Sequence, residues 1–183
     1  MDLDRVSVIG TSCSGKTTFA RNLATILGSP HFELDSLYWK PNWSGAPDEE
    51  FRASVEEVTR AARWVVDGNY RVANDLVWSR VTAIVWLNYP FPLVFYRALR
   101  RTIQRVARKE LLFAGNRETF RAAFLSRQSI LLWVITTHWR RRRQYAKILR
   151  DDARSGREAI VLRRPRDAQR FLRSVKSSMN QGG

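Results

Sequence analysis

The sequence is short of the residues that mark secreted and membrane proteins. It contains one cysteine, Cys13, which excludes an intramolecular disulfide framework. Its longest uninterrupted apolar run, Ile130 to Ile135, is far shorter than the about 20 residues that span a bilayer. The N-terminal Met-Asp-Leu-Asp-Arg lacks the basic and apolar stretches of a signal peptide. These absences predict a soluble cytoplasmic protein without a membrane partner.

The overall composition is that of a globular protein. Of 183 residues, 44% are hydrophobic and 27% are charged, which is unlike a disordered chain. The length suits one domain with a sizeable core, so we expect a single domain over residues 1–183.

Positive charge is abundant and unevenly placed. The formal charge is +15, and residues 97–150 hold 15 basic and 2 acidic side chains, whereas residues 1–96 hold 9 basic and 11 acidic ones. A basic segment of this kind suits polyanions such as nucleotide phosphates, nucleic acid or an anionic surface. A solvated helix face is the alternative interpretation.

Apolar patterning predicts strands that alternate with helices. Short strand-like runs cover 5–9, 31–34, 64–66, 81–87 and 159–162. Helical periodicity covers 16–27, 48–62, 92–109, about 117–150 with a break, and 167–176, and 35–47 reads as a loop. Strands joined through helices favour a parallel sheet with right-handed crossovers, and therefore a three-layer α/β fold.

A phosphate-binding motif joins the first predicted strand to the first predicted helix. Residues 10–17, Gly-Thr-Ser-Cys-Ser-Gly-Lys-Thr, match G-x-x-x-x-G-K-[ST] completely. The glycines let backbone N–H groups turn toward phosphate, and the following helix offers its positive end to the same anion. Lys16 adds a charge for the β- and γ-phosphates, and Thr17 is placed to bind Mg²⁺. The candidate ATP-binding residues here are Gly10, Thr11, Ser12, Cys13, Ser14, Gly15, Lys16, Thr17 and Thr18. A fortuitous turn is the competing interpretation of the motif, and Cys13 is either a redox-sensitive thiol or a small residue that fits.

Two aspartates follow predicted strands. Asp35 comes directly after strand 31–34, and Asp67 directly after strand 64–66. Ligands of open parallel sheets bind beyond the carboxyl ends of the strands, so both aspartates should converge with Gly10 on one edge. Phosphoryl transfer needs carboxylates near the metal and near the attacking hydroxyl. Taken alone, each aspartate could also serve a turn or a helix cap.

Three segments together resemble a known group of proteins. They are the phosphate loop, the run Leu34-Asp35-Ser36-Leu37-Tyr38-Trp39-Lys40-Pro41-Asn42-Trp43, and the run Trp64-Val65-Val66-Asp67-Gly68-Asn69-Tyr70. They resemble small adenylate-kinase-like P-loop proteins, and more closely the group labelled DNA topology modulation proteins. The resemblance covers most of the chain and implies a nucleoside-monophosphate-kinase fold with strand order 2-3-1-4-5.

The resemblance also implies roles for particular residues. Asp67 would hold Mg²⁺ through water, Arg71 would contact acceptor phosphate, and Asp35 would be the acceptor-side carboxylate. The chain departs from the pattern at Asn88, where such proteins often have Asp. That departure favours Asp67 as the metal partner.

Segment 97–150 lies where a lid is expected, between the fourth and fifth strands. Kinases of this kind close a mobile lid to exclude water and to bring arginines onto the phosphoryl group. A helical stripe at the required spacing is formed by Arg97, Arg101, Arg105 and Arg108, of which Arg101 and Arg105 are candidate catalytic residues. The stripe is also compatible with a solvated face or with nucleic-acid binding. Gly115-Asn116 is the expected lid tip.

The return helix of this segment offers further arginines. The resemblance favours those just before Tyr145, which leaves Arg141, Arg142 and Arg143 open, and Arg143 is the candidate taken forward. Arginine suits this role because its planar fork binds phosphate oxygens in pairs.

The loop after the fifth strand, Arg163-Arg164-Pro165-Arg166, is a candidate adenine site. The resemblance implies that Arg163 and Pro165 sandwich the adenine ring, and a guanidinium stacks well on a purine. An ordinary basic loop is the alternative.

Aromatic residues gather on the acceptor side of the predicted site. Tyr38, Trp39 and Trp43 follow Asp35, and Tyr70 follows Asp67. They would either stack a base-bearing acceptor or pack onto the core. His31 and His138 are expected to be structural, and no His/Cys cluster has metal-site spacing.

These observations predict a kinase that transfers the γ-phosphoryl group of Mg-ATP to a small acceptor, expected to be a nucleotide or nucleoside. The cofactors would be ATP and Mg²⁺. Lys16, Asp35, Asp67 and Arg71 would act with the lid arginines, and Thr17 and Asp67 would position the metal. The alternative is an ATP-dependent nucleic-acid-binding or DNA topology modulation factor, and a toxin-like kinase with an unusual acceptor is a third reading.

Overall fold

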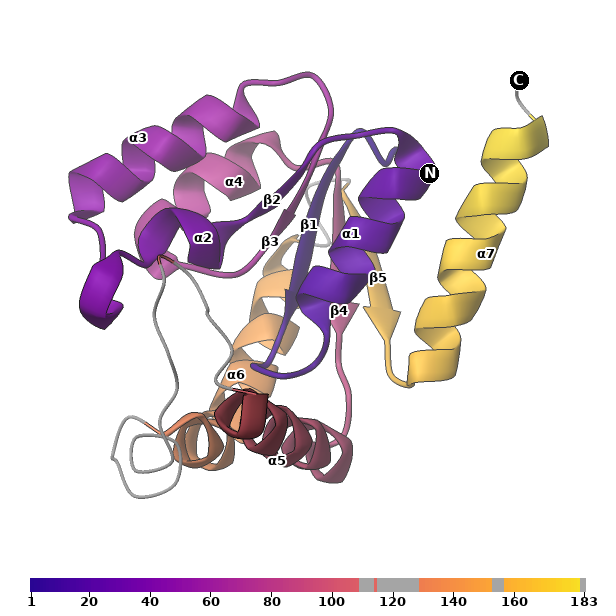
Figure 1. The fold of residues 1–183 in the computed structure, drawn as a ribbon. Helices are drawn as coiled ribbons and strands as arrows, with labels where there is room; N and C mark the ends of the chain where they lie inside the picture. The colour runs from indigo at the N-terminus through magenta and orange to yellow at the C-terminus, as the bar shows by residue number, and fades with distance from the viewer. Residues whose placement is uncertain (109–113, 115–128, 153–156, 182–183) are drawn as a thin grey trace.

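The computed structural model describes residues 1–108, 114, 129–152 and 157–181 (Figure 1). Its five strands are β1 (Arg5–Gly10), β2 (His31–Glu33), β3 (Trp64–Asp67), β4 (Ala83–Leu87) and β5 (Glu158–Leu162). They form one sheet in the order β2-β3-β1-β4-β5, and each adjacent pair is parallel. The expected α/β fold and its strand order are therefore confirmed.

Helices cover both faces of the sheet. They are α1 (Lys16–Leu27), α2 (Leu34–Tyr38), α3 (Asp48–Thr59), α4 (Asn74–Arg80), α5 (Phe91–Arg108), α6 (Ile130–Asp152) and α7 (Pro165–Gln181), with short 3₁₀ turns η1 (Pro41–Trp43) and η2 (Arg71–Ala73). Helices α1 and α7 pack side by side on one face, and α3 and α4 lie together on the other side (Figure 1). The result is three layers.

The side chains of β1 alternate between the two cores. Val6 and Val8 are fully buried in the core that also holds Leu23 of α1. Ile9 belongs to the opposite core, which includes Phe51 of α3. Because both faces are covered, the strand reads as a nearly continuous apolar run. Burying each of these side chains contributes about 1.5–3 kcal/mol, so β1 is a stable base for the loop that follows it.

Two helices lie where the sequence predicts none. Helix α2 occupies the start of segment 35–47, expected as a loop, and α4 lies within 71–80. They have 5 and 7 residues, too few for apolar periodicity to show. Strand β2 accordingly ends at Glu33, and Leu34 belongs to α2.

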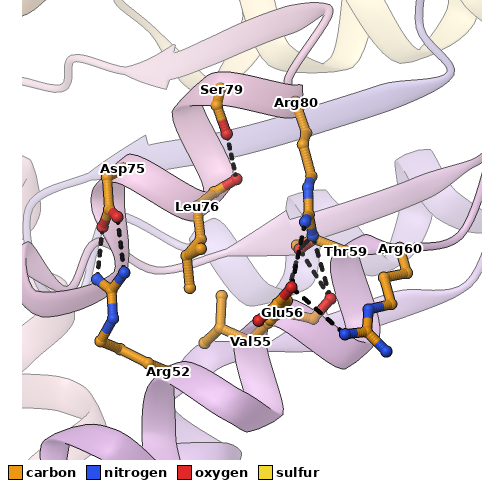
Figure 2. A network of polar contacts seen from close by, with 9 residues as sticks. All are labelled: Arg52, Val55, Glu56, Thr59, Arg60, Asp75, Leu76, Ser79 and Arg80. Atoms are coloured by element: carbon orange, nitrogen blue, oxygen red, sulfur yellow. Dashed lines mark hydrogen bonds and ion pairs between the residues drawn. The ribbon is translucent and has the colours of Figure 1, made fainter.

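Polar contacts with α3 hold α4 in place (Figure 2). Both terminal nitrogens of Arg52 donate to the carboxylate of Asp75 at 2.7 Å, and this contact lowers the pKa of Asp75. Arg80 donates to the buried hydroxyl of Thr59 at 2.8 Å. These partners are 23 and 21 positions apart in the sequence, so no local pattern could reveal the helix that they anchor.

The other boundaries differ by a few residues from the sequence prediction. Helix α3 ends at Thr59 rather than at 62, β4 begins at Ala83 rather than at 81, and α7 extends beyond 167–176 in both directions. The expected lid tip Gly115-Asn116 and the helical pattern at 117–128 lie outside the described residues. In the part of the chain that the structure describes, no helix is both long and apolar enough to cross a membrane.

Candidate active site

The phosphate loop leaves β1 at Gly10 and enters α1 at Lys16. A Cβ at Gly10 would lie 2.8 Å from Oγ of Ser14 and 2.9 Å from the carbonyl oxygen of Leu87, closer than real contacts allow. Gly15 has a φ of +91°, in the left-handed region that glycine adopts without strain. These two constraints explain both glycines of the motif. Cys13 also has a positive φ, +62°, which is strained for a residue with a side chain.

The polar side chains of the phosphate loop are only partly hydrogen-bonded within the described residues. The ammonium of Lys16 donates to the carbonyl oxygen of Thr11 at 3.3 Å, which folds this side chain back over the loop. The hydroxyl oxygens of Thr11 and Ser14 are buried and have no hydrogen-bond partner among the described residues. Leaving such groups unpartnered costs about 1–3 kcal/mol each. Phosphate oxygens supply acceptors of the kind that these hydroxyls lack.

Thr17, one residue into α1, lies between two carboxylates. Its hydroxyl oxygen is 3.1 Å from Oε1 of Glu33 and 3.1 Å from Oδ1 of Asp67. Glu33 and Asp67 are register partners in the parallel pair of β2 and β3, which brings both to the start of α1. Burial, and then the negative charge of Asp67, raises the pKa of Glu33. The sequence analysis identified Asp67 but not Glu33.

The buried Asp67 has a second partner in His31. Nε2 of His31 lies 2.7 Å from Oδ2 of Asp67, so both carboxylate oxygens are hydrogen-bonded. His31, expected to be only structural, therefore contacts a candidate metal residue. It stands two positions before Glu33 on β2, on the same face of the sheet. Because side chains alternate between the two faces of a strand, the spacing of His31 and Glu33 could have indicated that they share a face.

These residues fit the nucleotide and the metal that the motif implies. The Thr17 hydroxyl and the Asp67 carboxylate are oxygen ligands of the kind that Mg²⁺ prefers. Within the described ranges, no group of three His, Cys, Asp or Glu side chains could hold a metal alone. A magnesium ion here would take its remaining ligands from phosphate oxygens and water, as is usual for this ion.

Just after the end of β2, Asp35 meets Tyr70. The Tyr70 hydroxyl donates to Oδ1 of Asp35 at 2.5 Å. The Tyr70 ring centre lies 4.7 Å from that of Tyr38 and 4.9 Å from that of Phe51. Of the two interpretations of the aromatic residues, packing onto the core therefore describes Tyr38 and Tyr70.

Two tryptophans extend this cluster outward. Trp39 and Trp43 contact edge to face with ring centres 5.5 Å apart, on a short hairpin closed by a bridge between Trp39 and Gly45. Asn42 and Trp43 have φ angles of +59° and +56°, a conformation that costs energy in residues with side chains. Trp43 is 39% exposed, so part of its ring lies at the surface, unlike the rings of Tyr38 and Tyr70.

Arg97 reaches the phosphate loop from α5. Its Nη1 donates to the carbonyl oxygen of Ser14 at 2.7 Å, and its guanidinium lies 5.2 Å from the centre of the Tyr89 ring. In the same predicted stripe, Arg101 is exposed and Arg105 is half-buried. Arg97 thus touches the phosphate loop, although it is not one of the two stripe arginines proposed as catalytic.

On α6, Arg142 rather than Arg143 contacts the end of a strand. Nε of Arg142 donates to Oδ1 of Asn88 at 2.6 Å, whereas Arg143 is exposed. The asparagine that departs from the related pattern is therefore an arginine partner. The buried Tyr145 lies one turn further on, with its hydroxyl 3.4 Å from the carbonyl oxygen of Gly10.

The remaining candidates lie further out. Arg71 is exposed at the start of η2, Thr18 is exposed on α1, Arg163 is exposed after β5, and Pro165 begins α7. No hydrogen bond or ion pair joins Arg71 or Arg163 to the phosphate loop among the described residues. A cavity of about 350 Å³, lined by Leu3, Leu27 and Phe171, lies near the N-terminus and α7, away from the carboxylates.

No family model matches the sequence, and no curated protein sequence matches it. Solved structures do match. A gluconokinase from Sinorhizobium meliloti 1021 is 18% identical, with a TM-score of 0.53 over 99% of this chain and 98% of that chain. A shikimate kinase from Acinetobacter baumannii in complex with shikimate is 16% identical, with a TM-score of 0.54 over 98% of this chain and 94% of that chain.

The chain has the fold of the small P-loop kinases. A sugar kinase from Janibacter sp. HTCC2649 matches in the same way, at 17% identity and a TM-score of 0.51 over 96% of this chain and 93% of that chain. Likeness at this level of identity shows the fold. The function of this P-loop kinase fold has to be argued from its own residues.

Proposed function

We propose that the protein is an ATP-dependent kinase that transfers the γ-phosphoryl group of ATP to a hydroxyl group of a small acceptor. The observation that carries the proposal is that two groups of polar side chains lie at the same end of the parallel strands. The Thr17 hydroxyl stands between Glu33 and Asp67 beside the phosphate loop, and Asp35 is held by Tyr70 next to them. A metal-side carboxylate and an acceptor-side carboxylate are the pair that phosphoryl transfer requires.

On the donor side, the loop backbone and Lys16 would bind the phosphates of ATP. Thr17 and Asp67 would hold Mg²⁺, which when bound neutralises charge on the β- and γ-phosphates. His31 fixes the orientation of Asp67 through its second oxygen. Arg71 and the arginines at 101, 105 and 143 would stabilise charge on the transferring group when the site closes.

On the acceptor side, Asp35 would orient the attacking hydroxyl and accept its proton. A hydroxyl acceptor needs such a base, whereas an acceptor phosphate is already anionic and would be repelled by Glu33, Asp35 and Asp67. Among the expected acceptors, these carboxylates favour a nucleoside or another alcohol over a nucleotide. The solved kinases of similar fold include one bound to shikimate and one described as a sugar kinase. Membership of the DNA topology modulation group stays a prediction.

The test is ATP consumption by the purified protein with Mg²⁺, alone and with shikimate, gluconate, simple sugars, nucleosides and nucleoside monophosphates. The phosphorylated product is followed by ³¹P NMR. Strong stimulation by one hydroxyl acceptor is the expected result. Stimulation by a nucleoside monophosphate alone would overturn the alcohol assignment, and no stimulation by any acceptor would count against the kinase.

One observation favours a second candidate, binding of a nucleic-acid backbone. The arginines of α3 and α4 are paired with carboxylates (Figure 2). On α7, by contrast, Arg166, Arg170 and Arg173 are exposed, share one helix face, and form no ion pair with the described residues. Unpaired cations in a row are available to a polyanion.

Salt separates the two candidates. Binding to a fluorescently labelled DNA duplex would weaken steeply as salt rises, with a log–log slope of about 0.9 per phosphate contact. Replacing Arg166, Arg170 and Arg173 by Ala would then lower that slope by about 2.7, or three contacts. Weak DNA binding at physiological salt, or an unchanged slope, would remove this candidate and leave the kinase unaffected.

A further inference from the structure

We propose that Tyr70 is a positioning residue that aims the carboxylate of Asp35 at the acceptor and keeps it ready to accept a proton. This inference rests on the proposed function, and it assigns a task to a residue that the phosphate-loop motif and the fold do not assign. It begins from the hydrogen bond in which the Tyr70 hydroxyl donates to Oδ1 of Asp35 at 2.5 Å.

The fold brings these two residues together. They are 35 positions apart, but β2 and β3 are parallel neighbours, and the chain leaves both at the same sheet edge. Asp35 is the second residue of α2, directly after β2, and Tyr70 comes three residues after the end of β3. Gly68, with a φ of +123°, lets the second segment turn where a Cβ would lie 2.9 Å from Cβ of Leu34. The close approach of the two segments therefore depends on a glycine at position 68.

The Tyr70 ring is fixed independently of Asp35. It packs against Tyr38 at an interplanar angle of 40° and against Phe51 of α3 at 57°. Phe51 is fully buried, so this packing is anchored in the core. A hydroxyl on a fixed ring can select one rotamer of a flexible carboxylate, which is what positioning requires.

The hydroxyl also has a fixed role as donor. Burial, and then the negative charge of Asp35, raises the pKa of Tyr70 above its ordinary value. The charged or titratable neighbours are Glu33 of β2 and Tyr38 of α2, and both act in the same direction. Tyr70 therefore keeps its proton throughout the useful pH range and remains a hydrogen-bond donor to Asp35.

One oxygen of Asp35 remains for the acceptor. Oδ1 accepts from Tyr70, while Oδ2 has no hydrogen-bond partner within the described part of the chain. In the transfer step, the acceptor hydroxyl gives its proton to Asp35, its oxygen forms the new bond to the γ-phosphorus, and the bond to the β–γ bridging oxygen breaks to release ADP. Tyr70 touches none of these atoms and acts through Asp35.

The first experiment compares Tyr70→Phe with the wild type, using the hydroxyl acceptor that gives the fastest turnover. We expect kcat to fall about 10-fold or more, because a hydrogen bond to a charged group is lost, while the Kd for ATP stays the same. The control is Tyr96→Phe, which removes the hydroxyl of an exposed tyrosine on α5 and should change neither quantity.

A double-mutant cycle separates positioning from a loss of packing. In an Asp35→Asn background, Tyr70→Phe should have almost no further effect on kcat, because its effect passes through the carboxylate. Additive losses would show that the Tyr70 hydroxyl acts independently of Asp35 and would overturn the proposal, as would an unchanged kcat in the single variant.

A measurement without turnover keeps this inference distinct from the proposed function. The ¹³C resonance of the Asp35 carboxyl, assigned with Asp35→Asn, is compared in the wild type and in Tyr70→Phe. Its chemical shift should change in the variant, because Oδ1 loses the hydrogen bond from Tyr70. An unchanged chemical shift would refute the coupling even if the protein is a kinase, and a changed shift would support the coupling even if no acceptor is phosphorylated.

Discussion

The donor half and the acceptor half of the site are built from different parts of the polypeptide. In the donor half, residues 10–17 with Arg97, both cationic side chains contact the main chain of the loop: Lys16 donates to the carbonyl oxygen of Thr11, and Arg97 donates to the carbonyl oxygen of Ser14. In the acceptor half, Asp35 with Tyr70 and the surrounding aromatic residues, the contacts run between side chains. A site held by the main chain depends on its backbone path, whereas one held by side chains can change specificity by substitution while the sheet stays in place.

The largest effect expected from this division is that of Lys16→Ala. Removing the cation of the phosphate-loop motif should lower kcat by at least about 10³-fold with every acceptor, because charge on the phosphates is left unbalanced. Lys147→Ala, at an exposed lysine of α6, is the control and should transfer normally. Circular dichroism should show both variants folded. Normal phosphoryl transfer by Lys16→Ala would contradict the proposed kinase mechanism.

Asp35→Asn should damage the acceptor half alone. Loss of the base should lower kcat by about 10²-fold or more. The Kd for ATP, measured by calorimetry, should stay within about twofold of the wild type, because no hydrogen bond or ion pair joins Asp35 to the phosphate loop among the described residues. If ATP binding fell together with kcat, the two halves would not be separable. If transfer were normal, Asp35 would not be the acceptor-side carboxylate.

Arg97→Gln tests whether a helix outside the motif belongs to the donor half. Loss of the charged donor to Ser14 should weaken ATP binding by about 10-fold, because the loop loses a hydrogen bond from a charged group to its main chain. The KM for the acceptor should not change. Arg100→Gln, on an exposed position of the same helix, provides the control. If Arg97→Gln and Arg100→Gln bound ATP with equal affinity, Arg97 would not belong to the donor half, which would then consist of residues 10–17 alone.

The smallest effect concerns a residue outside both halves. His138 is fully buried on α6 without a hydrogen-bond partner among the described residues, and burial, then Arg142, lowers its pKa. Below about pH 6.5 the unfolded chain binds a proton that the folded chain resists, so the free energy of unfolding should decrease as the pH falls through that value. The slope contributed by one group is at most about 1.4 kcal/mol per pH unit.

Urea unfolding at pH 7.5 and 5.5 measures this difference. In His138→Phe, the free energy of unfolding should fall less between these two pH values than in the wild type. The Kd for ATP and the KM for the acceptor should both stay unchanged. If the free energy of unfolding had the same pH dependence in the wild type and the variant, His138 would not contribute to it.

The same division explains what the sequence could predict. Residues 10–17 are contiguous, and their chemistry is carried by their order, so the phosphate loop and the strand and helix around it were recognisable. Asp35 and Asp67 were found because strand ends converge in a parallel sheet. Their partners were not found, since Glu33, His31 and Tyr70 acquire their contacts from the register of β2 and β3. Arg97 and Arg142 required the position of α5 and α6 relative to the sheet, which arginine spacing alone does not specify.

Strand β5 has a consequence for the behaviour of the protein in solution. It is a terminal strand of the described sheet, and Val161 on it is 38% exposed. An open strand edge with apolar side chains invites pairing with another chain. Arg157 lies directly before this strand, and Arg163 and Arg164 lie directly after it, so two copies that approach edge to edge bring like charges together. High salt screens that repulsion, and the protein should therefore be more prone to self-association in concentrated salt than in dilute buffer.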